Sequence, residues 1–299
     1  MVYLSYKMRE CIMNIQKWLN QNTKSLINKT VAISGSTGGL GRETANYLAM
    51  LSASLVLVDR NFNKSVAFAD ELRAKYPNVK ISHVTADMAD IESVKRAVDE
   101  LSQMKIDHLI LNAGAYSIPR CTCSTGYDNV FQINFVSPYY MANMLLPGIR
   151  DRGGRIVAVG SIAHNYSRID ESDIDFSTRK QASRVYGNAK RYLTYSLLDM
   201  SRGDVVIAHP GITFTGITNH YPPLIFALIK HPMKIIFMPA KKAALSIVKG
   251  IFQDCPSDSW IGPAVFDVWG NPKVKKLNTA KISERARIID IAKNIYKSI

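Results

Sequence analysis

The chain has 299 residues, which is long enough to bury a substantial core in one large α/β domain or two small ones. With 47% hydrophobic and 21% charged residues, the composition is that of a globular protein and excludes a disordered chain. The formal net charge of +14 at pH 7 is unusual, and it leaves open nucleic-acid binding, attraction to an anionic membrane surface, or a diffuse positive surface.

The basic residues are scattered along the chain, with modest clusters at Lys241–Lys242 and Lys273–Lys276. Because no aromatic residues alternate with these clusters, we expect no nucleic-acid partner. The cysteines have neither metal-ligand nor disulfide spacing, so we expect no metal and a reducing, cytoplasmic location. They are Cys11, Cys121, Cys123 and Cys255.

Residues 1–29 are predicted to be an N-terminal amphipathic extension. They lack the apolar block and small-residue cleavage site of a signal peptide, and no stretch of the chain is apolar for long enough to predict a spanning helix. A helix that caps the main domain is favoured over one that docks on a membrane, and peripheral membrane contact stays open. The apolar residues at helical spacing are Leu4, Met8, Cys11, Ile12, Ile15 and Leu19.

Residues 30–275 alternate short apolar runs with helical patterns, which is typical of βαβ units. We therefore expect one α/β domain, a doubly wound parallel sheet of about seven strands with helices on both faces, followed by a helical tail at 276–299. Strands are predicted at Thr30–Ser34, Ser54–Val58, Lys80–Thr85, His108–Leu111, Arg155–Val159, Val205–His209 and Trp260–Val265. Helices are predicted to start near Leu40, Lys64, Ile91, Tyr127, Tyr186 and Ala240.

A glycine-rich turn joins the first predicted strand to the first helix. Glycines here let the chain turn sharply and let backbone N–H groups approach a pyrophosphate, which the helix dipole also favours. A glycine turn alone also serves plain turns, but its place between strand and helix favours a dinucleotide site. No Gly-Lys-Ser/Thr follows, which argues against a nucleotide triphosphatase. The turn carries Gly35, Ser36, Thr37, Gly39, Leu40 and Gly41.

The second predicted strand is followed by Asp59 and Arg60. A carboxylate at this point can accept hydrogen bonds from the adenosine ribose and repel a 2′-phosphate, which favours NAD. The adjacent guanidinium can instead pair with a 2′-phosphate, which favours NADP. We expect NAD or NADP as cofactor, with Asp59 tilting the preference to NAD. The alternative is a solvated loop start.

Tyr186 and Lys190 are spaced to lie on the same face of a predicted helix. A neighbouring ammonium stabilises a phenolate, which would lower the pKa of the tyrosine and permit proton transfer near neutral pH. Ser161 ends a predicted strand, where α/β sheets place their ligands, and its hydroxyl could hold a substrate oxygen. Alone, the pair could be an ordinary surface face and Ser161 a turn residue.

Together these motifs resemble the short-chain dehydrogenase/reductase family of the classical type, which has a Rossmann-type fold. Gly160–His164, Phe131–Asn134 and Trp260–Pro263 resemble its retinol dehydrogenase-like branch in particular. Further elements that match the family are Asn112-Ala113-Gly114 and Pro210-Gly211 followed by Thr215.

The resemblance implies a role for each matching residue. Tyr186 would be the general acid/base, Lys190 would bind the nicotinamide ribose, Ser161 would orient the substrate, and Asn134 would support a proton relay. The expected catalytic residues are thus Asn134, Ser161, Tyr186 and Lys190. Beside the glycine turn, Asp59 and Arg60, the expected cofactor contacts are Asp87, Met88, Asn112, Ala113, Gly114, Tyr186, Lys190, Pro210, Gly211, Ile212 and Thr215.

Some positions depart from the family pattern. Ser34 replaces a threonine, Ala189 a serine and His209 an asparagine, whereas the acid at Asp59 is the serious departure because the retinol dehydrogenase-like branch usually uses NADP. The segment at about 216–240 resembles the family's substrate lid and is rich in large apolar residues. This predicts a lipophilic alcohol or carbonyl substrate, such as a steroid, a retinoid or a long-chain compound.

The sequence therefore predicts an NAD(P)-dependent oxidoreductase that transfers a hydride between nicotinamide and a lipophilic alcohol, ketone or aldehyde. The alternative is a catalytically weak nucleotide-binding or membrane-docking scaffold of the same fold. A homodimer or homotetramer is left open as well.

Overall fold

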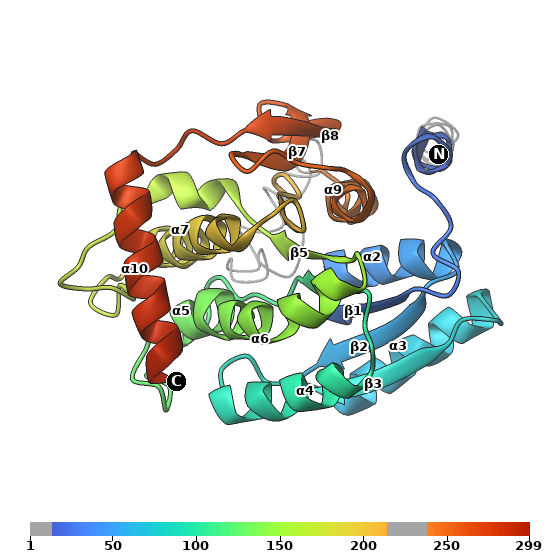
Figure 1. Ribbon diagram of the computed structural model, residues 1–299, viewed down its shortest axis with the longest axis horizontal. Helices are drawn as coiled ribbons and strands as arrows, with labels where there is room; N and C mark the ends of the chain where they lie inside the picture. Colours follow the sequence, from blue (N-terminus) through green and yellow to red (C-terminus); the bar gives the residue numbers. More distant parts are fainter. Residues whose placement is uncertain (1–13, 214–237) are drawn as a thin grey trace, which may run out of the picture.

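A computed structural model describes residues 14–213 and 238–299 (Figure 1). An eight-stranded sheet forms its centre, in the order β3-β2-β1-β4-β5-β6-β7-β8. All neighbouring strands pair in parallel except the last two. The strands are β1 Thr30–Ser34, β2 Ser54–Asp59, β3 Ile81–Thr85, β4 His108–Leu111, β5 Arg155–Val159, β6 Val205–Ala208, β7 Ser259–Val265 and β8 Trp269–Lys276.

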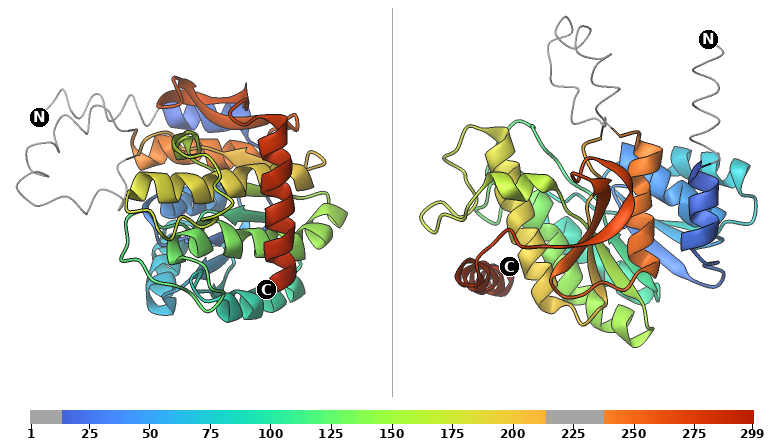
Figure 2. Two further views of the ribbon diagram at one scale, coloured as in Figure 1. Left: turned by 90° about the vertical axis from the view of Figure 1, so that its left-hand side faces the viewer. Right: turned by 90° about the horizontal axis from the view of Figure 1, so that it is seen from above.

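Two helical layers cover the sheet, and each buries its own apolar cluster against one face (Figures 1 and 2). The first layer holds α4 Ile91–Gln103, α6 Ser137–Asp151 and α7 Ala182–Met200, with α10 Ile282–Ser298 packed outside α7. The second layer holds α2 Gly39–Met50, α3 Phe62–Lys75 and α9 Ala240–Phe252. The short helix α5 Asn129–Phe131 and the π-helix η1 Gln132–Val136 lead into α6, and the 3₁₀ helix η2 Ile162–Tyr166 follows β5.

The predicted α/β class, parallel sheet and two-sided helical cover are confirmed. The strands β1, β2, β4, β5 and β6 are buried on both faces, which explains their largely apolar sequences, whereas β3 lies at an edge of the sheet and is only partly buried. The sheet has eight strands where about seven were expected. The additional strand β8 is lysine-rich and lies antiparallel at the sheet edge, where charged side chains protect exposed backbone groups from pairing with another chain.

The N-terminal residues 14–22 are helical, and Trp18 and Leu19 are buried against α2 and α9. These contacts are those of a helix that caps the domain, while residues 1–13 lie outside the described residues. The expected lid at about 216–240 falls mostly on residues 214–237, which also lie outside them. Within 14–213 and 238–299, no helix is long and apolar enough to span a membrane.

The strand order reverses between β1 and β4, because successive strands are added on opposite sides of this pair. In open parallel sheets, ligands bind at the carboxyl ends of the strands at such a switch point. The glycine turn follows β1 and Asn112 follows β4. The fold therefore brings both to one crevice.

Candidate active site

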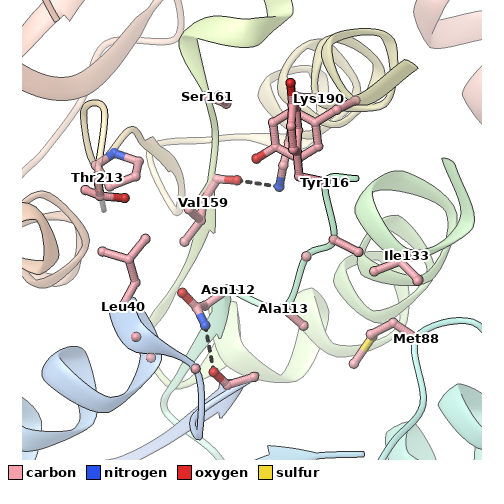
Figure 3. Close-up of a pocket in the computed structure, with 18 of the residues that line it drawn as sticks. Leu40, Met88, Asn112, Ala113, Tyr116, Ile133, Val159, Ser161, Lys190 and Thr213 are labelled. Carbon is pink, nitrogen blue, oxygen red and sulfur yellow. Dashed lines mark hydrogen bonds between the residues drawn. The ribbon is translucent and has the colours of Figure 1, made fainter. Parts of the chain in front are cut away.

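A pocket of about 730 Å³ lies at this switch point. Its size is within the range of roughly 300–1,000 Å³ that is usual for ligand sites. One end is formed by the glycine turn and the ends of β2 and β3, and the other by Ser161, Tyr186 and the turn after β6. Figure 3 shows Leu40 and Asn112 on one side of the open space and Ser161, Tyr116 and Lys190 on another.

In the glycine turn, the backbone at Gly41 packs very closely against the backbone at Gly35, which leaves the ligand side of the turn free of side chains. A Cβ on Gly41 would lie 2.1 Å from the carbonyl oxygen of Gly35, so no side chain fits at that position. Gly35 has a φ of +67°, which glycine adopts without strain. The first turn of α2 can therefore approach a pyrophosphate with its N–H groups exposed.

Ser34 and Asn112 tie the glycine turn to the end of β4. The Ser34 hydroxyl accepts hydrogen bonds from the N–H groups of Asn112 and Ala113, both at 3.0 Å. The Asn112 side-chain amide donates to the carbonyl oxygens of Ser34 at 3.0 Å and Gly35 at 2.9 Å. The serine that stands in place of the family's threonine thus retains the hydroxyl that this junction needs.

Asp59 is buried, with only 4% of its surface exposed, and its carboxylate points back to the glycine turn. Oδ1 accepts from the Thr37 N–H and hydroxyl, both at 3.2 Å. Oδ2 accepts from the Ser36 hydroxyl at 2.5 Å and the Ser65 hydroxyl at 3.0 Å. A carboxylate has about four acceptor positions. These four hydrogen bonds fill them.

The neighbouring Arg60 is oriented very differently. Its side chain is 74% exposed at the pocket, and its guanidinium lies 3.9 Å from the carboxylate of Asp87. Asp87 accepts a hydrogen bond from the Ala89 N–H, and Asp90, not Asp87, caps α4. The side chain of Asp87 is therefore not used to cap the helix and lies at the pocket wall.

Lys190 lies at the buried end of the pocket, with 2% of its surface exposed. Its ammonium donates one hydrogen bond, 2.9 Å long, to the carbonyl oxygen of Val159 (Figure 3). Burial lowers the pKa of this lysine to about 8. An ammonium has three donors, so two remain for groups in the pocket.

Tyr186 lies one helical turn before Lys190, in contact with Ser161. Burial raises the pKa of Tyr186 to about 12, and a hydrogen bond with the Ser161 side chain opposes part of this shift. The Lys190 ammonium lies 5.6 Å from the centre of the tyrosine ring. The pKa of Tyr186 is therefore raised where a lowered pKa was expected, because burial dominates, and the phenol is protonated at neutral pH.

Asn134 is fully buried behind the pocket wall, in the π-helical segment before α6. Its amide donates to the carbonyl oxygens of Ala115 at 2.6 Å and Val130 at 2.8 Å, and its oxygen accepts from the Ala115 N–H at 3.2 Å. A Cβ on Gly114 would lie 2.8 Å from this oxygen and 3.8 Å from the Lys190 ammonium. The asparagine thus fixes the loop that separates it from the lysine.

Most residues expected at the catalytic and cofactor-binding sites line this one pocket. They are Gly35, Thr37, Gly39, Leu40, Gly41, Asp59, Arg60, Asp87, Met88, Asn112, Ala113, Gly114, Ser161, Tyr186, Lys190, Pro210, Gly211 and Ile212. Ser36 and Asn134 lie behind the wall, and Thr215 lies outside the described residues.

The structure adds side chains that the sequence patterns missed. Tyr116 packs edge-on against Tyr186, with ring centres 5.3 Å apart, and Ile118, Ile162 and Tyr166 line the same end of the pocket. All of them lie within six residues of Gly114 or Ser161. Their nearness to these motifs was the only available signal, because their side-chain directions depend on irregular loops.

The described residues fit a nicotinamide dinucleotide. The glycine turn supplies a cradle that a Cβ would fill, and the buried Lys190 ammonium keeps two donors toward the far end of the same pocket. A phosphate-binding end and a proton-transferring end are thus joined by one cavity.

Comparison with known proteins agrees with this assignment. Residues 29–184 match the family described as short chain dehydrogenase. The chain belongs to the short-chain dehydrogenase family. Membership of this family supports NAD(P) binding by the chain, and the relatives support the retinol dehydrogenase-like branch.

Among these relatives, retinol dehydrogenase 13 of Homo sapiens is 28% identical over 202 residues, which cover 64% of this chain and 61% of that protein. Polyprenol dehydrogenase of Homo sapiens is 25% identical over 208 residues, which cover 64% and 63%. The chain thus spans less than two thirds of the length of either relative. An uncharacterized protein from Mycobacterium paratuberculosis has a similar structure, with a TM-score of 0.73, 25% identity, and coverage of 92% of this chain and 95% of that one.

Proposed function

We propose that this protein is an NAD(P)-dependent oxidoreductase that interconverts a lipophilic alcohol and its ketone or aldehyde. The observation that carries the proposal is the contact of Tyr186 with Ser161 in the pocket that also holds Lys190 and the glycine turn. A phenol, a serine hydroxyl and an ammonium in one crevice suit proton transfer to or from an alcohol oxygen.

The nicotinamide, when bound, supplies or accepts the hydride. Ser161 orients the substrate oxygen toward Tyr186, whose hydroxyl gives up a proton in reduction and whose phenolate takes one in oxidation. Lys190 uses its two remaining donors to hold the cofactor ribose, and its positive charge stabilises the phenolate while it forms. Asn134 keeps the Gly114–Ala115 loop in place beside the lysine.

A lipophilic substrate is supported by the side chains that surround Tyr186. Tyr116, Ile118, Ile162 and Tyr166 give this end of the pocket an aromatic and aliphatic wall. Such a wall favours an apolar substrate over a sugar, because sugar hydroxyls need polar partners. The names of the two human relatives, which refer to retinol and to polyprenol, support the same class.

For the cofactor, we propose a preference for NADP in place of the expected NAD. The expectation of NAD relied on a carboxylate that is free to bind ribose hydroxyls, but Asp59 already accepts four hydrogen bonds. Arg60 and Lys64 line the same part of the pocket with exposed cationic side chains. Two cationic side chains beside a carboxylate whose acceptor positions are already filled favour binding of the 2′-phosphate that distinguishes NADP from NAD.

The proposed activity is tested by a variant that lacks the hydroxyl oxygen of Tyr186. Tyr186→Phe should keep cofactor binding but lower kcat by about a hundredfold or more, because the proton donor is deleted. Tyr192→Phe is the matched control, since Tyr192 lies on the same helix and its buried hydroxyl has no hydrogen-bond partner among the described residues. Decanol, a hydroxysteroid and retinol, each offered with NAD and with NADP, are suitable probes.

Equal turnover by Tyr186→Phe and Tyr192→Phe would reject Tyr186 as the acid/base. Cofactor binding without turnover of any probe by the unmodified protein would instead favour the alternative of a catalytically weak nucleotide-binding scaffold.

A further inference from the structure

A chain of buried hydrogen bonds leads from the C-terminal segment to Ser161. The Nδ1 atom of His164 lies 2.6 Å from the carbonyl oxygen of Ser161, and its Nε2 atom lies 2.7 Å from the Thr279 hydroxyl. The Thr279 hydroxyl in turn contacts the Tyr195 hydroxyl on α7. These groups come from η2, from the loop between β8 and α10, and from the helix that carries Tyr186.

The donors in this chain can be assigned from its chemistry. A carbonyl oxygen only accepts, so Nδ1 of His164 must carry a proton and donate. Burial lowers the pKa of His164 to about 4, so the ring is neutral near pH 7 and Nε2 is an acceptor. Thr279 therefore donates to His164, and the proton of Tyr195 points to Thr279. All the hydrogen bonds run in one direction, toward Ser161.

His164, the last group in this series of hydrogen bonds, holds the backbone that positions the Ser161 hydroxyl. Ser161 caps η2, and its Oγ accepts a hydrogen bond of 3.1 Å from the Ala163 N–H. A hydroxyl has one donor and two acceptor positions, so this contact leaves the serine proton available to Tyr186. The geometry holds only while η2 stays in place. The His164 side chain, which belongs to η2, holds the cap residue in place through the carbonyl oxygen of Ser161.

Contacts of Arg191 and Trp260 hold this series of hydrogen-bonded groups in place. Arg191 is fully buried and donates to the carbonyl oxygens of His164 at 3.0 Å and Thr279 at 2.8 Å, while it pairs with Glu284 at the start of α10. Trp260 packs edge-on against the His164 ring, with centres 5.1 Å apart.

Trp260 also contacts a second part of the site. It stacks on His209 at 4.9 Å, and the His209 ring accepts a weak hydrogen bond from the Gly211 N–H at 3.4 Å. The histidine that replaces the family's asparagine thus still serves the Pro210–Gly211 turn. Trp260 thus contacts both a histidine of the serine turn and a histidine beside the Pro210–Gly211 turn, which form the same end of the pocket.

We propose that Thr279 and His164 are positioning residues, through which the C-terminal segment holds the Ser161 hydroxyl in line with Tyr186. The proposal rests on the proposed oxidoreductase activity. Neither residue lines the pocket, so neither would touch substrate or cofactor.

Thr279→Val removes the hydroxyl and keeps the branched shape. With decanol and NADP as probes, kcat should fall by about tenfold or more, because small misplacements of a catalytic group are costly. The NADP dissociation constant should stay within about twofold, because the phosphate-binding end is distant from Thr279. Thr279→Ser, which keeps the hydroxyl, should restore kcat.

The matched control is Thr194→Val. Thr194 is a buried threonine on α7 whose hydroxyl has no hydrogen-bond partner among the described residues, so its loss should leave kcat unchanged. The pH profile of kcat/KM for oxidation separates positioning from general destabilisation. Thr279→Val should move the apparent pKa of the essential base upward, because the Ser161 hydrogen bond that opposes the raised pKa of Tyr186 is weakened. Thr194→Val should not move it.

A nitrogen-15 NMR spectrum of the histidine rings tests the chain without turnover. His164 should be neutral near pH 7 with its proton on Nδ1, and its Nε2 signal should change in Thr279→Val but not in Thr194→Val. A proton on Nε2 would overturn the assigned direction, and unchanged kcat and pH profile in Thr279→Val would overturn the positioning role. If the unmodified protein turns over none of the probes, the activity fails while the NMR result still decides the hydrogen-bond chain.

Discussion

Replacing Lys190 by methionine should make the protein more stable while it abolishes activity. Burial lowers the pKa of Lys190 from its ordinary 10.5 to about 8. Each pKa unit corresponds to about 1.4 kcal/mol, so the buried ammonium costs the folded state about 3 kcal/mol at pH 7. Methionine fills a similar volume without the charge but leaves the Val159 carbonyl unpaired, which costs about 1 kcal/mol.

The net gain of about 2 kcal/mol should raise the melting temperature of Lys190→Met by about 3 °C, because the unfolding entropy of a chain of 299 residues is roughly 0.6 kcal/mol/K. The gain should also depend on pH in a defined direction. Below pH 8 the lysine is protonated in both the folded and unfolded states, so its full cost is present. Between pH 8 and 10.5 the unfolded state binds more protons, and the stability of the unmodified protein rises relative to that of the variant. Above 10.5 the lysine is neutral in both states, so its charge cost is gone and the variant should be less stable by about 1 kcal/mol, the cost of the unpaired Val159 carbonyl.

Calorimetric melting of both proteins from pH 7 to 10.5 measures this difference, and background titrations cancel in the comparison. Lys64→Met is the control, because Lys64 lines the same pocket but is exposed. A loss of stability in Lys190→Met that is the same at every pH would refute the reasoning. It would mean that hydrogen bonding and packing of the lysine outweigh the cost of its buried charge.

Three other perturbations test the pocket. Arg60→Ala should lower kcat/KM with NADP by about tenfold relative to NAD, because a charge-assisted hydrogen bond is lost. Asp59→Asn should loosen the glycine turn and weaken the binding of NAD and NADP to the same extent. A tenfold change of preference toward NADP in Asp59→Asn would instead show that the carboxylate selects the cofactor. Affinity should rise along a series of alcohols of increasing chain length, by up to about 0.8 kcal/mol per buried methylene, and better turnover of short polyols would contradict the lipophilic wall. Gly41→Ala should abolish binding of either cofactor, as measured by calorimetry, because its Cβ would lie 2.1 Å from the Gly35 oxygen, while Gly38→Ala, with 3.5 Å to the same oxygen, should bind normally.

The parts of the fold that were predictable from sequence are those with a continuous apolar signal. The bounds of β1, β4 and β5 agree with the prediction residue by residue, because each is a short apolar run buried between two helical layers. Strand β8 had no such signal. Lys273, Lys275 and Lys276 give it the composition of a solvated loop, and only pairing with β7 makes it a strand.

The parts of the candidate site in which a motif determines which residues come together were predictable from sequence. The parts in which contacts depend on side-chain direction were not. Tyr186 and Lys190 share a helix, so their common face follows from spacing alone. The position of Asp59 at the end of β2 was foreseen as well. Its partners were not, because Ser36 in the glycine turn and Ser65 in the first turn of α3 both direct their hydroxyls toward the carboxylate, and nothing in the spacing of the sequence indicates those rotamers.

Lys190 and Arg191 are adjacent buried cations on α7 that differ in how far their charges are compensated by partners. Arg191 pairs with Glu284 and two carbonyl groups, an arrangement that compensates for the loss of hydration and joins α7 to α10. Lys190 has a single carbonyl partner, and its charge remains costly until an anionic or polar ligand occupies the pocket. Because the uncompensated charge is the one that faces the pocket, binding of a cofactor relieves a cost that folding alone cannot remove.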